Sequence, residues 1–262
     1  MNKELFDALN TAYRGAQADL DQVLPGFSMT SLQEDQALGF LALMLEQNQT
    51  LNLSAIRDPE EAIYLHLIDS WTLLPLIDRE VQATSDVPTL DASPFTFLDL
   101  GTGAGFPGVP VKILWPDLDL FLVDALAKRL KFLDRALEEI GLSQPWQCVH
   151  ARAEDLGRQG DFRDRLDFVT ARALASLPVL LEYALPLVKP GGVFVAMKAK
   201  YQDELAQAGQ AAQKLGADLE DIRTFTLPRF QADRSFLIYR KLQATARKYP
   251  RSNAQIKKSP LS

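Results

Sequence analysis

Three glycines that alternate along Gly101-Thr102-Gly103-Ala104-Gly105 constrain the fold of this chain more than any other segment. An apolar run from Phe95 to Leu98 precedes them and leads into Asp99, and Pro107 opens a second apolar segment after them. Glycine has no Cβ, so it permits a tight turn and lets a ligand approach the main chain. Proline suits the start of a helix. The segment predicts the strand, turn and helix of a doubly wound α/β sheet that holds an adenosine-containing cofactor.

Two cofactors fit this turn. Gly103, Gly105 and Gly108 match the spacing G-x-G-x-x-G, and Asp124 follows about 20 residues later, as in a dinucleotide-binding fold. Asp99, however, stands close before the first glycine, where a carboxylate repels a pyrophosphate and attracts a cationic amino-acid end. S-adenosylmethionine has such an end, so we favour it. The alternative for Asp99 is a loop carboxylate that caps local amides.

Strand and helix patterns alternate along the rest of the chain. Leucines and Ile140 recur at helical spacing from Leu126 onward until Gly141. The remaining expected strands are 118–123, 146–150, 166–170 and 188–197, with a closing antiparallel pair at 219–226 and 236–240. This order predicts an α/β fold, a mostly parallel seven-stranded sheet of the Rossmann-like class I methyltransferase type, and favours a methyltransferase over a dehydrogenase.

The first 94 residues form a separate region in this interpretation. Helical spacing predicts helices near residues 5–16 and 38–48 and a third from Pro59 to Ile77, with a loop from Asp19 to Ser31 between the first two. Thr84 to Pro94 is a polar link to the first strand. We therefore expect a helical cap and linker (1–94), a cofactor-binding core (95–241) and a basic C-terminal tail (242–262).

The stretch FLDLGTGAGFPGVPVKILWPDLDLFLVDALAKRLKFL closely resembles the glucose-inhibited division protein B (RsmG) family. These proteins are bacterial small-subunit ribosomal RNA guanine-N7 methyltransferases. The resemblance continues through NLSAIRDPEEAIYLHLIDSW, HARAEDL, FVTARALASLP and RKYPRSNAQIKKSPL, and so covers roughly residues 35 to 262. It implies a methyl transfer from S-adenosylmethionine to N7 of a guanine in 16S ribosomal RNA of the 30S subunit.

The resemblance also implies the residues of the cofactor site. Gly101 would admit the methionine end and Phe106 would pack against the cofactor. Asp124 and Ala125 match the ribose-binding strand end, Ala153 and Glu154 the adenine-side loop, and Arg172 an arginine beside the donor methyl. It assigns no catalytic base or nucleophile and no metal ligand. The leucine at position 126 stands where many relatives have a small polar residue.

The sequence also narrows the methyl acceptor. Thr170-Ala171-Arg172-Ala173 replaces the Asn/Asp-Pro-Pro-aromatic motif that binds exocyclic amines. Cys148 is the sole cysteine and lies within an apolar strand, whereas cytosine-C5 transfer needs a cysteine nucleophile. Guanine N7 has a lone pair and no proton, so positioning alone suffices. We interpret His66 as structural. The alternative, which the family's His-x-x-Asp-Ser segment implies, is that His66, Asp69 and Ser70 face the cofactor or the RNA. The alternative function is a small-molecule S-adenosylmethionine-dependent methyltransferase.

Charge is distributed unevenly along the chain. The net charge is -6, but residues 240–262 contain seven cations and no acid. A cationic tail on an acidic body can contact RNA phosphates, and the alternative is a solvated, idle end. Lys198 and Lys200 either extend a basic rim at the cofactor edge or are ordinary strand-end lysines. A single cysteine suits a reducing compartment, and no apolar run approaches the roughly 18 residues of a membrane helix. We expect a cytoplasmic protein that binds neither membranes nor DNA.

Overall fold

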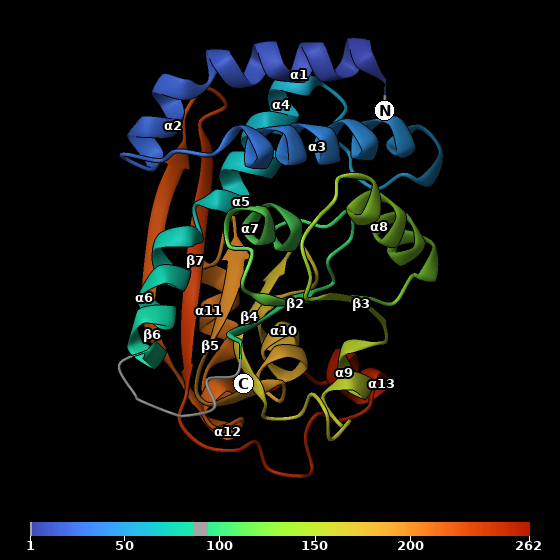
Figure 1. Cartoon of the computed structure of the whole chain (residues 1–262). Coiled ribbons are helices and arrows are strands. Elements are labelled where there is room, and N and C mark those ends of the chain that lie inside the picture. The colour runs from blue at the N-terminus through green and yellow to red at the C-terminus, as the bar shows by residue number, and fades with distance from the viewer. Residues whose placement is uncertain (1, 86–93) are drawn as a thin grey trace.

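In the computed structural model, which describes residues 2–85 and 94–262, seven strands form one mixed sheet in the order β3-β2-β1-β4-β5-β7-β6 (Figure 1). Strands β1 to β5 run parallel, and β7 is antiparallel to both β5 and β6. The strands are β1 Thr96–Leu100, β2 Asp119–Asp124, β3 Trp146–His150, β4 Leu166–Arg172, β5 Val188–Lys198, β6 Ala217–Leu227 and β7 Ala232–Lys241. The predicted fold class is confirmed.

The register places the chain's polar strand ends at one edge of the sheet. Asp124 pairs with His150 and Arg172 with Met197, so the carboxyl ends of β2 to β5 lie together. Because β7 is antiparallel, it starts at this carboxyl edge and ends at the amino edge. Ligands of open α/β sheets bind outside the carboxyl ends of the strands.

Alternating side chains divide the core into two layers. On β1, for example, Phe97 packs into one apolar cluster and Leu98 into the other, because successive strand residues point to opposite faces. The first cluster joins one face of the sheet to the N-terminal half of the chain. Its helices are α1 Lys3–Gly15, α2 Gln17–Val23, α3 Ser31–Leu51, α4 Pro59–Ala62, α5 Asp69–Trp71, α6 Leu74–Ser85, α7 Gly108–Leu114 and α8 Ala127–Glu139.

The second cluster covers the opposite face and includes the end of the chain. Its helices are α9 Ala153–Leu156, α10 Leu177–Ala184, α11 Gln202–Ala208, α12 Ala211–Lys214 and α13 Asn253–Lys258. Tyr249 and Ile256 of the predicted tail are buried in this layer, so residues 242–262 are not a free solvated end. The predicted link Thr84 to Pro94 falls mainly on residues 86–93, outside the described residues.

The single helix predicted from Pro59 to Ile77 is wrong. The chain forms α4, then a π-helical turn η1 (Ile63–Ile68), then α5, and a new helix starts at Leu74. Ser70 donates to the carbonyl of His66, a side-chain bond that competes with the helical ladder. Pro75 has no amide to donate to Trp71, so the helix ends before it. The loop predicted from Asp19 is also wrong in part, because α2 continues to Val23.

Candidate functional site

The glycine turn follows β1 at the carboxyl edge of the sheet. The amides of Gly101 and Thr102 both donate to the Val123 carbonyl at 2.9 Å, which ties the turn to β2. Gly101 has φ +72°, and a Cβ added there would lie 2.6 Å from Cδ1 of Leu174. Gly105 has φ +96° and would meet Leu133 and Phe40 at 2.8 Å. The local backbone and its neighbours therefore both require glycine.

Asp99 lies beneath this turn and is 1% exposed. Its Oδ2 accepts from the Thr102 hydroxyl at 2.7 Å and the Gly108 amide at 3.0 Å, which is the local capping considered above. Its Oδ1 is buried and has no partner in the described part of the chain. Burial raises the pKa of Asp99 to about 6, against the lowering effect of those two hydrogen bonds and of Arg172. An unsatisfied buried oxygen leaves room for a ligand cation.

Asp124 ends β2 and is 5% exposed. Its Oδ2 accepts from the Gly103 amide at 3.0 Å and from Arg129 at 3.1 Å, and its Oδ1 accepts from the Leu126 amide at 2.8 Å. Each carboxylate oxygen has two lone pairs, so Oδ1 keeps one acceptor position. The carbonyl of Ala125 lies 3.1 Å from the His150 ring. These contacts fix the carboxylate next to the glycine turn.

Glu154 lies in α9, the short helix after β3. Its side chain is 7% exposed. The amide of Ala151 donates to the Asp124 carbonyl at 3.3 Å, which joins this segment to the end of β2. Ala153 is partly exposed at the start of α9. The structure thus brings Ala153, Glu154 and Asp124 to one edge, as the sequence predicts.

Arg172 ends β4 and joins the sheet to the N-terminal helices. Its guanidinium donates to Asp69 at 2.8 Å and to the Leu65 carbonyl at 3.0 Å, and lies 3.2 Å from Nδ1 of His66. Asp69 is 1% exposed and also accepts from Nε of Arg234 at 2.8 Å. Two arginines therefore neutralise the buried carboxylate of Asp69. The sequence does not predict Arg234 as part of this site, because it lies on β7, far along the chain from Asp69.

His66 stacks on Phe106, with ring centroids 4.3 Å apart and an interplanar angle of 9°. Burial and the charge of Arg172 lower the pKa of His66 to about 3, so the ring is neutral at physiological pH. Nδ1 then accepts from Arg172, and Nε2 donates to the Ser54 hydroxyl at 2.9 Å. Both ring nitrogens are engaged, which agrees with a structural role for this histidine.

Phe106 is 3% exposed, and its ring contacts Phe40, His66 and Arg172. Most of its surface is therefore covered by protein in this structure, and its predicted packing against the cofactor stays a prediction. Cys148 lies on the edge strand β3, where burial raises the pKa of its thiol well above the usual value. It is not an activated nucleophile.

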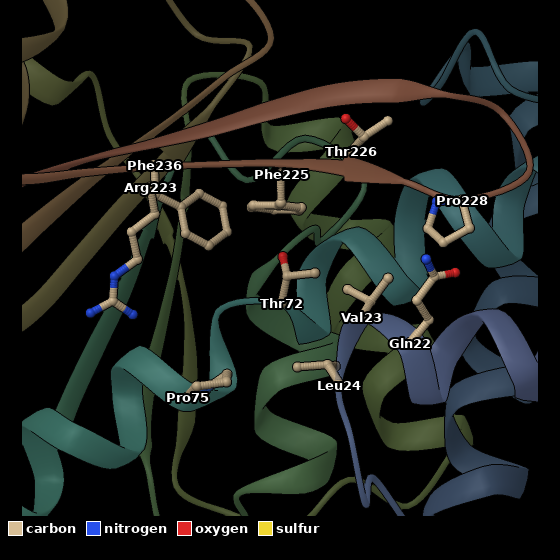
Figure 2. A pocket seen from close by; sticks show the side chains of 10 residues that line it. All are labelled: Gln22, Val23, Leu24, Thr72, Pro75, Arg223, Phe225, Thr226, Pro228 and Phe236. Carbon is tan, nitrogen blue, oxygen red and sulfur yellow. The ribbon is translucent and has the colours of Figure 1, made fainter.

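A cavity of about 390 Å³ opens beside Arg172. It combines an apolar wall with two arginines and a lysine, and its lining residues are Ile56, Leu65, His66, Asp69, Arg172, Ala173, Met197, Lys198, Ala199 and Arg234. Lys198 is held by Glu204 at 2.6 Å and by the Ala175 carbonyl at 2.7 Å. A second cavity of about 300 Å³ lies between α2, the α5–α6 connection and the β6–β7 hairpin (Figure 2). None of the predicted site residues lines that second cavity.

The donor set decides between the two cofactors considered from the sequence. Asp99, Asp124 and Glu154 place three buried carboxylates around the glycine turn. They would repel a pyrophosphate and suit a ligand with an ammonium group, vicinal hydroxyls and an amino-bearing base. These residues fit S-adenosylmethionine. In the described part of the chain, no cluster of His, Cys, Asp or Glu is suited to a metal ion, and no helix is long and apolar enough to cross a membrane.

Comparisons with known proteins agree with this site. A family model described as GidB, rRNA small subunit methyltransferase G, matches residues 33–233. The Ribosomal RNA small subunit methyltransferase G of Acetivibrio thermocellus is 41% identical over 90% of this chain and 92% of its own length. Its namesake from Lactobacillus delbrueckii subsp. bulgaricus is 38% identical over the full length of both chains.

The fold likeness extends to more distant solved structures. A putative O-methyltransferase from Klebsiella pneumoniae matches 89% of this chain and 100% of its own with a TM-score of 0.55 at 13% identity, which shows the shared Rossmann-like methyltransferase fold. The family model and the relatives that align over most of their length identify the family more specifically than the shared fold does. The chain belongs to the GidB family, the rRNA small subunit methyltransferase G family, and is an S-adenosylmethionine-dependent methyltransferase.

Proposed function

We propose that this chain transfers the methyl group of S-adenosylmethionine to N7 of a guanine in 16S ribosomal RNA, acting on the small ribosomal subunit in the cytoplasm. The observation that carries the proposal is the position of Arg172, which lines the cavity and whose charge also acts on the buried carboxylate of Asp99 beneath the glycine turn. The family match supports the RNA substrate, and the chemistry of the cavity supports N7. The proposal includes the predicted cofactor-site residues Gly101, Phe106, Asp124, Ala125, Ala153, Glu154 and Arg172 as the residues that bind S-adenosylmethionine.

The acidic residues around the glycine turn would account for cofactor binding. The unpartnered Oδ1 of Asp99 would receive the ammonium group, and Asp124 would accept from the ribose hydroxyls. Glu154 would read the amino group of the adenine, and Gly101 would let the methionine end reach the main chain. When bound, the cofactor supplies an electrophilic methyl group on its sulfonium. Arg172 lines the cavity and lies close enough to Asp99 to lower the pKa of that carboxyl, so it can hold an acceptor base beside the donor.

The cavity suits an acceptor that needs no proton removed. His66 is neutral with both nitrogens engaged, and Asp69 is held by Arg172 and Arg234, so neither is a free base. Guanine offers O6 and N7 as acceptors on one edge. A cation that donates to O6 alone leaves the N7 lone pair for in-line attack, whereas a bidentate arginine would block it. The apolar wall at Ile56 and Met197 would contact the base.

The test is transfer of labelled methyl from S-adenosylmethionine to purified 30S subunits that lack the modification, with nucleoside mass spectrometry of the product. We expect about one N7-methylguanine per particle, and Gly101→Val should abolish it. Transfer to small molecules but not to the subunit would favour the alternative function. Transfer to a different guanine atom would keep the substrate class and refute the N7 assignment.

A further inference from the structure

Most lysines and arginines of this chain already have partners inside the protein. Lys241, the last residue of β7, is 0% exposed and donates to Asp164, Thr245 and two carbonyls. Arg251 in the tail binds Glu182. Arg240, next to the tail, binds Glu80 and Glu220. Three of the seven cations that suggested an RNA-binding tail therefore act within the fold, and their charge is neutralised there.

The cations without an ion pair or a hydrogen-bonded side chain in the described residues fall into two groups. Outside the tail they are Lys3, Arg57, Lys128, Lys131, Arg152 and Lys200, and within it they are Arg247, Lys248, Lys257 and Lys258. Lys248 lies over the Tyr249 ring at 5.2 Å. All ten of these side chains are exposed. Lys3 on α1 and Lys131 on α8 have no predicted site residue or cavity residue as a neighbour along the chain. The question is which group faces the substrate.

Four of the unpaired cations follow elements that build the site, and we name Arg57, Lys128, Arg152 and Lys200 the rim cations. Arg57 is next to Ile56, which lines the cavity, in the loop whose Ser54 bonds His66. Lys200 follows Ala199, another lining residue. All four rim cations are exposed.

The other two rim cations are next to elements of the predicted cofactor site. Lys128 is in the first turn of α8, beside Arg129, whose guanidinium contacts Asp124. Arg152 precedes the α9 segment that carries Ala153 and Glu154. The rim cations thus come from four separate segments, and each neighbours, along the chain, a residue that lines the cavity, belongs to the predicted cofactor site or contacts Asp124. The adjacent acid Asp58 is engaged in capping α4 through the Glu61 amide.

The tail follows a different path and does not line the cavity. It leaves the sheet at the end of β7, at the amino edge, where Arg240 pairs with Val193. It then packs along α9 and α10, with Arg158 donating to the Pro250 carbonyl and Arg251 binding Glu182 (Figure 1). The free tail cations are therefore on the helical layer that covers one face of the sheet, and they do not line the cavity.

We propose that the rim cations, rather than the tail, form the main phosphate-binding surface for RNA and hold the strand whose guanine enters the cavity. This inference rests on the proposed function. A protein of net charge -6 repels RNA at long range, so productive binding needs unpaired cations where the base must enter. Four cations around one mouth suit the phosphates on both sides of a single unstacked nucleotide, because proteins recognise specific RNA bases mainly in single-stranded loops.

The test uses two quadruple variants that remove the same charge. The rim variant carries Arg57→Gln, Lys128→Gln, Arg152→Gln and Lys200→Gln, and the tail variant carries Arg247→Gln, Lys248→Gln, Lys257→Gln and Lys258→Gln. Affinity for unmodified 16S ribosomal RNA transcribed in vitro is measured by filter binding between about 50 and 200 mM salt. Thermal unfolding and calorimetric S-adenosylmethionine binding show that each variant keeps its fold and its cofactor site.

We expect the rim variant to lose at least about tenfold in RNA affinity and about three in the salt slope, because each contact to single-stranded RNA contributes about 0.7. The tail variant should stay within about twofold of the unaltered protein. An equal or larger loss in the tail variant would overturn the proposal. The single variants Arg57→Gln and Lys200→Gln, on separate loops, should each give part of the rim effect. Unaltered protein that binds neither this RNA nor purified 30S subunits would refute both this placement and the proposed function.

Discussion

Any side chain at position 101 would conflict with both the backbone conformation and the neighbouring Leu174. Its φ of +72° strains any L residue, and the space beside it is occupied by Leu174, which is itself 38% exposed. The contact is with the end of the Leu174 side chain, which is partly exposed and can shift. The backbone strain is about 1 to 3 kcal/mol. We therefore expect Gly101→Val to remain folded and to lose at least about tenfold in S-adenosylmethionine affinity, measured by calorimetry.

A matched control separates strain from obstruction of the site. Gly26 has φ +76°, nothing lies within 4 Å of a Cβ added there, and it is far from the turn. Gly26→Val should lose comparable stability in thermal unfolding and keep the cofactor affinity of the unaltered protein. Equal cofactor affinity in the two variants would contradict the assignment of Gly101 to the cofactor site.

Asp99 gives the site a pH dependence. Its pKa of about 6 in the folded chain exceeds the roughly 3.9 of an unfolded aspartate, so between these values the folded state binds more protons. The free energy of unfolding of the cofactor-free protein therefore falls as pH rises through that window. A cationic ligand beside Oδ1 prefers the ionised form. Its affinity should increase about tenfold from pH 5 to pH 7, as calorimetry would show.

Asp99→Asn provides the control for this titration. The amide keeps an acceptor oxygen for Thr102 and Gly108 but has no charge to gain. We expect a weaker affinity for S-adenosylmethionine that is nearly constant over the same pH range. A tenfold pH effect that persists in this variant would assign the titration to another group.

Residues within one contiguous motif could be predicted from the sequence, and residues brought together from distant elements could not. Asp99 and the glycines lie in the motif itself, and Asp124 follows from its place at the end of the next strand. Arg234 and Ser54 reach Asp69 and His66 only through tertiary packing. No spacing along the chain links them, although Arg234 lies two residues before the strand predicted from 236.

At the scale of elements, strands were predicted better than helices. The five parallel strands lie within two residues of their predicted bounds because they are short apolar runs between turn residues. The interrupted helix from Pro59 depends on a π-helical turn whose residues Ile63, His66 and Ile68 are buried against other elements. Such turns are frequent at functional sites and leave no periodic pattern of their own. α13 begins at a capping box formed by Ser252 and Gln255. This helix was not predicted from the sequence, because residues 242–262 were interpreted by their basic composition.

The contact between α10 and the segment before α13 gives a stability prediction. The Glu182 side chain is 0% exposed and accepts from the backbone amide and guanidinium of Arg251 at 2.7 to 3.1 Å. Arg251→Ala leaves a buried carboxylate without its partner, so we expect a loss of about 3 kcal/mol in the free energy of unfolding, measured with urea. Lys257→Ala, exposed on α13, should change it by less than about 0.5 kcal/mol.

A double variant tests whether the loss comes from the uncompensated charge. Adding Glu182→Leu to Arg251→Ala replaces the buried carboxylate by an apolar side chain and should recover much of the stability. Additive losses in the double variant would show instead that packing of the arginine stem dominates.

At the scale of the whole molecule, charge and structure are distributed differently from what composition suggests. Residues 240–262 are the most basic segment, yet three of their cations neutralise buried or partly buried acids. Four of the six free cations of the body are the rim cations. In our proposal an acidic excess coexists with the local cationic surface that these four residues form, so net charge alone does not indicate where RNA binds.

The same distribution determines what truncation would do. Removing residues 242–262 deletes Tyr249 and Ile256 from the second apolar cluster and leaves Glu182 without Arg251. It also strips Arg163 of the carbonyls of Thr245 and Tyr249, to which it donates at 2.6 and 2.8 Å. We expect the truncated chain to unfold at a temperature lower by at least about 10 °C, because several kcal/mol are lost and each shifts the midpoint by about 2 to 4 °C.

This prediction separates a structural tail from a substrate-binding one. Loss of RNA binding on truncation would accompany a large loss of stability, so it would not identify a phosphate contact. The tail variant with four glutamines keeps Tyr249, Arg251 and Ile256, and should therefore unfold within about 2 °C of the unaltered protein in the same calorimetric scan. A truncated chain with an unchanged midpoint would mean that the second helical layer is stable without its C-terminal segment. The tail would then be free to serve the substrate alone.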